Sequence, residues 1–310
     1  MKIQHSIGGT PVSFFKRILL GGVIACTALL GSTAWAQTTS FTASYNGASA
    51  SGGSSCGTSY NISGVEPSAT GKYPVFIYTV GTYESYNNAS AMAAVNKMAA
   101  KGYIAAAVGY GTSQFGSCTA IKNKASCIYN PNNSASAISK LCSRPNADCS
   151  KGVVVGGFSQ GSIIAINAKN YDSRVQAAYA IGSSTQYSSY DMSTCMADGN
   201  RTLQSDRLRV VNGEKDTYGG GTQAGNQAEL QKITGKTCAA GSYACMNSNN
   251  SGWIIVKNTQ VQDSSADHCY MRKSGDCLGS QSSLDSGWQS GTSNWQLEQN
   301  LHWLTGFTTP

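Results

Sequence analysis

The chain has 310 residues, of which 12% are charged, and its formal net charge is +7 at pH 7. Its basic residues form no Lys/Arg run and no stripe with interleaved aromatic residues, so this charge does not indicate a nucleic-acid partner. The length suits one α/β domain, and no linker or internal repeat suggests a second domain.

The N-terminal segment has the pattern of a secretory signal. Basic residues precede an apolar stretch at 18–31, and Ala34-Trp35-Ala36 fits a small-residue cleavage site. The apolar stretch is shorter than the ~20 residues that span a bilayer. We therefore expect residues 1–36 to be a signal peptide cleaved near Ala36, no stable membrane span, and a secreted catalytic domain over 37–310, extracellular or periplasmic. A lipoprotein signal that ends at Cys26 is the alternative.

Strand and helix patterns alternate along the rest of the chain. Residues 37–70 are rich in Ser, Gly and Thr, and their weak alternation predicts early antiparallel strands. Further strands are predicted at 74–80, 103–108, 152–156, 175–181, 208–211 and 253–256, and helices at 89–101, 134–142, 162–169, 227–233 and 295–304. Apolar strands that alternate with helices predict a single α/β domain, with a central, mostly parallel β-sheet covered by helices on both faces.

Three Gly/Ser/Asn-rich stretches, 112–133, 183–205 and 217–250, are predicted to be loops held by disulfides. The last contains the predicted helix 227–233 and is interpreted as an insertion that forms either a lid or a wall of the substrate site. Its sequence favours neither alternative.

The cysteines predict disulfides. One of the 11 lies in the signal, which leaves an even set of ten, as is typical of exported proteins. Short sequence separations predict the pairs Cys118–Cys127, Cys142–Cys149, Cys238–Cys245 and Cys269–Cys277, with Cys56 and Cys195 left for a long-range link. No C-x-x-C motif occurs and few histidines remain, so neither a metal nor a cofactor is expected.

One motif carries chemistry. Gly157-Phe158-Ser159-Gln160-Gly161 fits the pattern G-x-S-x-G, between a predicted buried strand and a predicted helix. Such a sharp turn holds the serine in a strained backbone and leaves room only for glycine on either side. An ordinary glycine-rich turn is the alternative. The context predicts that Ser159 is a nucleophile.

A serine nucleophile needs a base and an acid that orients the base. His268 follows the last predicted strand, whereas His302 lies in the last predicted helix, where we expect a packing role. Asp216 follows the strand 208–211 and is the predicted acid. Its rivals are Glu214, Asp263 and Asp267.

The order Ser159, Asp216, His268 resembles that of the α/β-hydrolase superfamily. The resemblance covers residues 72–307 and implies an acyl-enzyme mechanism, with an oxyanion hole built from two backbone N–H groups. The first would belong to Gln160. The second would belong to Thr82, with its neighbour Tyr83 as the alternative, because this sequence lacks the His-Gly-Gly-Gly form of that loop.

The Phe-Ser-Gln centre of the motif resembles the cutinase elbow, although the 52 positions from Asp216 to His268 are more than cutinases have. We therefore predict a secreted, monomeric carboxylic ester hydrolase that acts on a small ester or a polyester, with cutinase- or lipase-like activity as a finer interpretation. The alternatives are a secreted serine peptidase and a non-catalytic binding protein with the same fold.

Overall fold

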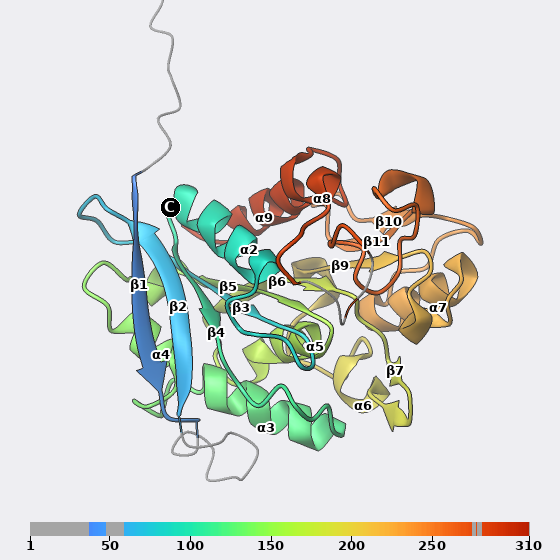
Figure 1. Cartoon of the computed structure of the whole chain (residues 1–310). Coiled ribbons are helices and arrows are strands. Elements are labelled where there is room, and N and C mark those ends of the chain that lie inside the picture. The colour runs from blue at the N-terminus through green and yellow to red at the C-terminus, as the bar shows by residue number, and fades with distance from the viewer. Residues whose placement is uncertain (1–36, 48–58, 275–276, 278–280, 310) are drawn as a thin grey trace, which may run out of the picture. The chain divides into compact units, whose positions relative to one another are not determined.

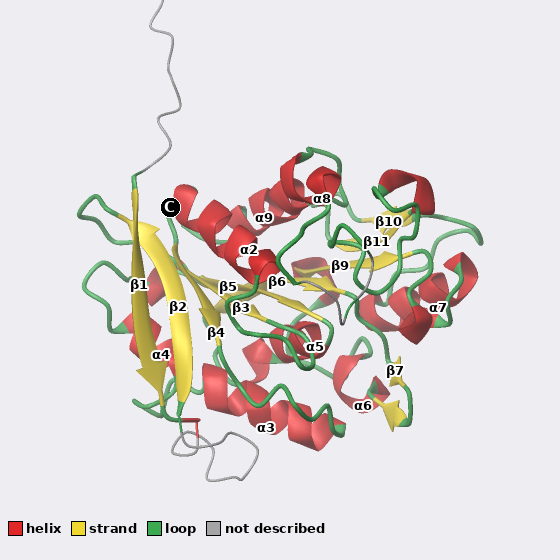
Figure 2. Cartoon of the chain, viewed as in Figure 1, coloured by secondary structure: helices red, strands yellow, loops and turns green. Residues whose placement is uncertain are grey.

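The computed structural model describes residues 37–47, 59–274, 277 and 281–309. Within these residues, nine strands form one sheet in the order β1-β2-β4-β3-β5-β6-β9-β11-β10 (Figures 1 and 2). Their bounds are β1 Thr38–Tyr45, β2 Tyr60–Pro67, β3 Val75–Thr79, β4 Ile104–Val108, β5 Val153–Phe158, β6 Val175–Ile181, β9 Leu208–Gly213, β10 Ala244–Met246 and β11 Gly252–Val256. Six neighbouring strands run parallel to one another, in the sheet order β4-β3-β5-β6-β9-β11. The strands β1, β2 and β10 pair antiparallel with their neighbours. The predicted mostly parallel α/β sheet is confirmed.

The parallel part of the sheet holds the core. Every residue of β3, β4, β5, β9 and β11 is buried, because helices cover both faces of these strands. These strands are therefore nearly continuous apolar runs, which is why their positions could be predicted from the sequence. The strand β6 has the predicted bounds.

Helices cover the two faces of the sheet. In Figure 1, α2, α8 and α9 lie on one side, and α3, α5, α6 and α7 on the other. Their bounds are α2 Ala89–Ala100, α3 Cys118–Tyr129, α4 Ala137–Cys142, α5 Gln160–Ile166, α6 Ser193–Met196, α7 Gln223–Thr234, α8 Ser286–Ser290 and α9 Leu297–Thr305. Local capping fixes several starts: the side chains of Asn88 and Thr222 accept hydrogen bonds from the first turns of α2 and α7.

The prediction that 112–133 is a loop is wrong, because this stretch contains α3. The helix buries Ile121, Ala125 and Ile128, which recur at the spacing of one helix face, and Ser117 caps its start. The surrounding Gly, Ser and Asn residues obscured this pattern. The stretch 183–205 likewise contains α6 and a small hairpin of β7 Gln186–Tyr187 and β8 Tyr190–Asp191.

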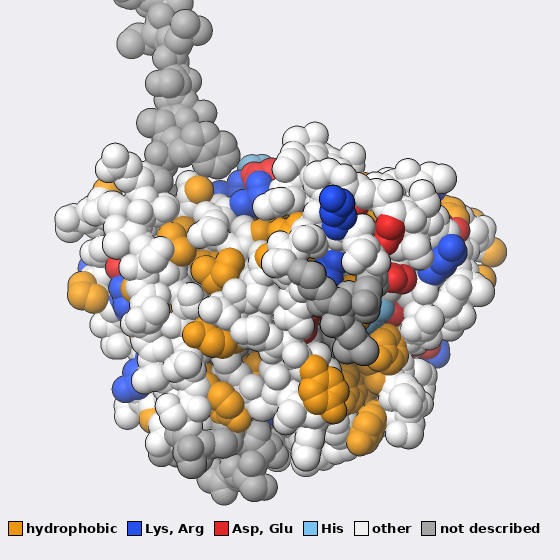
Figure 3. Space-filling model, in the orientation of Figure 1, with side chains coloured by type: hydrophobic (Ala, Val, Ile, Leu, Met, Phe, Trp, Pro, Cys, Tyr) orange, Lys and Arg blue, Asp and Glu red, His pale blue; other side chains and the backbone are white. Residues whose placement is uncertain are grey.

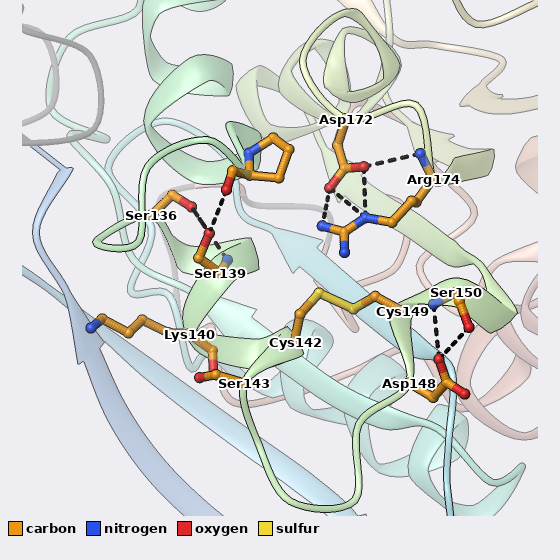
Figure 4. The surroundings of a disulfide bond; sticks show 11 residues. Ser136, Ser139, Lys140, Cys142, Ser143, Asp148, Cys149, Ser150, Asp172 and Arg174 are labelled. Carbon is orange, nitrogen blue, oxygen red and sulfur yellow. Dashed lines mark hydrogen bonds and ion pairs between the residues drawn. A yellow bond between two sulfur atoms is a disulfide. The ribbon is translucent and has the colours of Figure 1, made fainter.

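Four disulfides lie within the described residues. Cys142–Cys149 (Figure 4), Cys238–Cys245 and Cys269–Cys277 have the predicted pairing. The predictions for the other cysteines are wrong, since Cys118 is bonded to Cys195. Cys118 and Cys127 are nine residues apart on α3 and therefore about 13 Å apart along the helix axis, too far for a bridge.

Cys127 is also disulfide-bonded. Cys56 lies outside the described residues, as do the predicted signal peptide and Cys26. Within the described part of the chain, none of the helices is long and apolar enough to cross a membrane.

Candidate active site

Ser159 lies at the turn from β5 to α5, with a φ of +52° and a ψ of −121°. Such a backbone is costly for any residue with a side chain and is typical of functional sites. A Cβ atom on Gly157 would lie 2.3 Å from the carbonyl oxygen of Gly161, and one on Gly161 would lie 2.2 Å from the carbonyl oxygen of Thr79. The turn therefore requires both glycines.

The side chains of His268 and Asp216 meet at the carboxyl ends of β9 and β11. Their Nδ1 and Oδ2 atoms lie 2.8 Å apart, and the other oxygen of Asp216 accepts a hydrogen bond from the backbone N–H of Tyr218. Asp216 is fully buried and His268 is 8% exposed. This contact positions the imidazole and favours the tautomer with the proton on Nδ1.

The Nε2 atom of His268 is buried and has no hydrogen-bond partner within the described residues. Ser159 and His268 line the same cavity of about 510 Å³, although no hydrogen bond joins them. The arrangement leaves Nε2 available to take a proton from a group inside the cavity.

The rival acids have other partners. Glu214 accepts hydrogen bonds from the hydroxyl of Tyr243 and the backbone of Asn258. Asp263 accepts one from the backbone of Ser265. Asp267 lines the cavity, and burial raises its pKa to about 6, but its carboxylate accepts a bond from the backbone of Cys269 rather than from the imidazole.

His302 lies on α9, outside the cavity that contains Ser159. Its side chain is exposed, so the expected packing role is wrong. The neighbouring Trp303 and Leu304 are buried, because α9 turns that face towards the sheet. This position, outside the cavity that Ser159 and His268 line, favours His268 over His302 as the candidate base.

Two backbone N–H groups near Ser159 are free to donate. Within the described residues, neither Gln160 N nor Thr82 N has an acceptor, whereas Tyr83 N donates to the carbonyl oxygen of Thr112 at 3.1 Å. The side-chain amide of Gln160 also donates to Thr82 Oγ1 at 3.2 Å, which joins the two segments. These contacts favour Thr82 over Tyr83 as the second donor.

A buried lysine, Lys124, contacts the side chain of Gln160, and the sequence analysis did not identify it. Lys124, on α3, is 5% exposed, and its ammonium donates to the side-chain oxygen of Gln160 at 3.2 Å and to the carbonyl oxygens of Gln114 and Phe115. Burial lowers its pKa to about 8. Its position on the unpredicted helix explains why sequence reasoning did not find it.

Lys124 makes stability depend on pH. Because its folded-state pKa of about 8 is below its ordinary value of 10.5, the unfolded chain binds more protons between these values. The free energy of unfolding of the wild type, relative to that of Lys124→Met, should therefore rise by about 2 kcal/mol from pH 7.5 to 9.5. Urea titrations at several pH values measure this difference, and a difference that stays constant or falls would contradict the assignment.

A buried ion pair links the loop that carries Thr82 to the segment that follows His268. The carboxylate of Glu84 accepts a hydrogen bond from Gly81 N at 2.6 Å and pairs with the guanidinium of Arg272. The bridge from Cys269 to Cys277 begins one residue after His268. Together these contacts restrain both sides of the cavity.

The chain was also compared with known proteins. No family model matches it. No curated protein matches it either. Among solved structures, it is similar to "Methylesterase BT1017", with 18% sequence identity and a TM-score of 0.41 over 58% of this chain. The match spans 44% of that protein, less than half of its length.

Proposed function

We propose that the protein is a carboxylic ester hydrolase in which Ser159 is the nucleophile, His268 the base and Asp216 the acid. The observation that carries this proposal is the pairing of His268 with buried Asp216 beside a strained serine in one cavity. A nucleophile, a base and an orienting carboxylate form the set that acyl transfer requires.

In the proposed reaction, Ser159 Oγ attacks the ester carbonyl while its proton passes to Nε2 of His268. The N–H groups of Gln160 and Thr82 stabilise the resulting oxyanion. The intermediate then expels the alcohol, which takes the proton from His268, and leaves an acyl-serine. Water attacks the acyl group with His268 as base, releases the acid and regenerates Ser159. Asp216 stabilises the charged imidazole in both steps.

We also infer that the protein is exported. Its disulfides favour an oxidising compartment, and residues 1–36 have the composition of a signal peptide. The mature chain would then begin near Gln37, one residue before β1. N-terminal sequencing of the exported protein tests the cleavage site, and lipid attached at Cys26 would overturn it.

Labelling with a fluorophosphonate tests the nucleophile and the reaction class. We expect the wild type to form one adduct, located by peptide mapping on Ser159, and to hydrolyse 4-nitrophenyl acetate but not peptide anilides. No labelling would support a binding protein, and faster cleavage of anilides would indicate a peptidase. A series of 4-nitrophenyl esters of increasing chain length, beside a polyester film, tests for cutinase- or lipase-like preference.

Asp216→Asn should lower the turnover number for 4-nitrophenyl acetate by about three to four orders of magnitude. An amide at this position can donate to Nδ1, which favours the tautomer whose Nε2 carries a proton and cannot act as a base. Glu214→Gln is the matched control, and it should change turnover by less than threefold, because Glu214 contacts Tyr243 and Asn258. If the Glu214 variant is the more damaged of the two, the acid is misassigned.

A further inference from the structure

Exposed aromatic side chains gather at the candidate active site. Within the described residues, three large hydrophobic side chains are exposed: Tyr83 (69%), Tyr190 (40%) and Tyr218 (39%). All three line the cavity that contains Ser159. Figure 3 shows hydrophobic side chains grouped on this face, on the part near β7. Exposed aromatic rings concentrated at one cavity indicate a surface that binds a ligand.

Four aromatic side chains that line this cavity form a continuous series, which begins beside the proposed base, His268. We call this series the aromatic wall: Phe115, Tyr187, Tyr190 and Tyr218. The ring of Tyr218 lies 4.5 Å from the imidazole of His268 and 4.9 Å from the ring of Tyr187. Phe115 lies 4.6 Å from Tyr187 and 5.7 Å from Tyr190. A group bound at Ser159 therefore has aromatic surface beside it from the reacting atoms outwards.

Hydrogen bonds hold the centre of the wall. The hydroxyl of Tyr187 donates to the carbonyl oxygen of Gly182 at 2.7 Å and accepts from Ser184 N at 3.1 Å. Both contacts are internal to the protein, so the hydroxyl is occupied and the ring is what Tyr187 contributes to the cavity. A rigid ring favours a flat apolar partner over a polar one.

The Cys118–Cys195 bridge joins the two segments that supply the outer rings. Phe115 precedes Cys118 by three residues, and the β7–β8 hairpin with Tyr187 and Tyr190 precedes Cys195 by a few. Lys124 also donates to the carbonyl oxygen of Phe115. The wall is thus held in place before a ligand binds, which lowers the entropy lost on binding.

We propose that the cavity selects esters that carry a planar aromatic ring next to the scissile ester group, with that ring lying against the aromatic wall. This proposal rests on the proposed function and adds the substrate class. Ring pairs at such distances favour offset or edge-to-face contact. A saturated ring of the same size offers no such face, so matched aromatic and alicyclic esters should be distinguished.

Two pairs of esters test this selection: ethyl benzoate against ethyl cyclohexanecarboxylate, and benzyl acetate against cyclohexylmethyl acetate. Acid release is followed in a pH-stat, so no chromogenic aromatic leaving group interferes. We expect kcat/KM to favour the aromatic ester by fivefold or more in at least one pair, as one or two ring contacts would give. The pair that shows the preference identifies the acyl or the alcohol side. A ratio below fivefold in both pairs would overturn the proposal.

Variants connect the preference to the wall. Phe115→Leu and Tyr218→Leu should each reduce the aromatic-to-alicyclic ratio at least threefold. Tyr171→Leu, at a half-buried tyrosine outside the cavity, is the control and should leave the ratio unchanged. A ratio that survives both wall variants would also refute the proposal.

Hydrolysis of ethyl acetate distinguishes a wrong substrate class from a wrong function. If the wild type hydrolyses it, Ser159→Ala does not, and the aromatic esters show no preference, then the substrate class is wrong and the proposed function stands. If none of the esters is hydrolysed, both are wrong.

Discussion

Replacing Ser159 with alanine is expected to lower the turnover number for a small ester by about three or more orders of magnitude and to preserve the fold. The contacts of this residue within the protein are made by its backbone: its N–H donates to the carbonyl oxygen of Ile181 at 2.8 Å, and its carbonyl oxygen accepts from Ser162. Alanine keeps these contacts and has the same steric cost at a φ of +52°. The loss should therefore fall on chemistry.

Ser162→Ala provides a matched control three residues away. It removes two buried hydrogen bonds, to the carbonyl oxygen of Ser159 and from the hydroxyl of Ser183, and should cost about 1–3 kcal/mol of stability. Its turnover should fall less than tenfold. The two variants should thus show opposite patterns in activity assays and thermal melts. A Ser159→Ala protein that keeps a tenth of the wild-type turnover would exclude this serine from the mechanism.

His268→Ala should be nearly as damaging to turnover as the serine variant, by about three orders of magnitude, because no other histidine among the described residues lines the cavity. The loss of stability in His268→Ala should be larger than that in Ser159→Ala. The imidazole contacts the rings of Phe158 and Tyr218, and its removal leaves one oxygen of buried Asp216 without its partner. We expect a loss of about 1–3 kcal/mol in urea unfolding.

His302→Ala is the control for this variant. Its side chain is exposed on α9, so both turnover and melting temperature should stay close to those of the wild type. Added imidazole should restore part of the activity of His268→Ala and none of that of Ser159→Ala. Loss of activity in the His302 variant with retention in the His268 variant would reverse the assignment of the base.

The parts of the molecule that could be predicted from sequence are those that depend on short stretches of chain. A parallel strand buried on both faces is a run of apolar residues. The positions of β5 and β6 could therefore be predicted without knowing which strands pair with them in the sheet. The residues proposed as the triad follow or end such strands. Their relative positions therefore follow from the rule that the carboxyl ends of parallel strands meet at one edge of the sheet.

The parts that could not be predicted depend on segments that are distant in sequence. Cys118 and Cys195 are 77 positions apart, and no local pattern indicates that α3 and α6 lie together. The contact of Lys124 with Gln160 requires α3 to pack against α5, another helix that is distant in sequence. The rings of the aromatic wall come from three loops between the main strands, and their approach depends on how those loops fold over the sheet edge.

The Cys118–Cys195 bridge has a practical consequence for how this protein is prepared. The residues proposed as the triad lie at or after the ends of sheet strands and do not depend on this bridge for their positions, whereas the segments that carry Phe115 and Tyr190 would lose their covalent connection if it did not form. Batches that differ only in the formation of this bridge should then be equally active on ethyl acetate and unequal in their choice between aromatic and alicyclic esters. Selectivity, rather than activity, is the property by which protein with the Cys118–Cys195 bridge formed should be recognised.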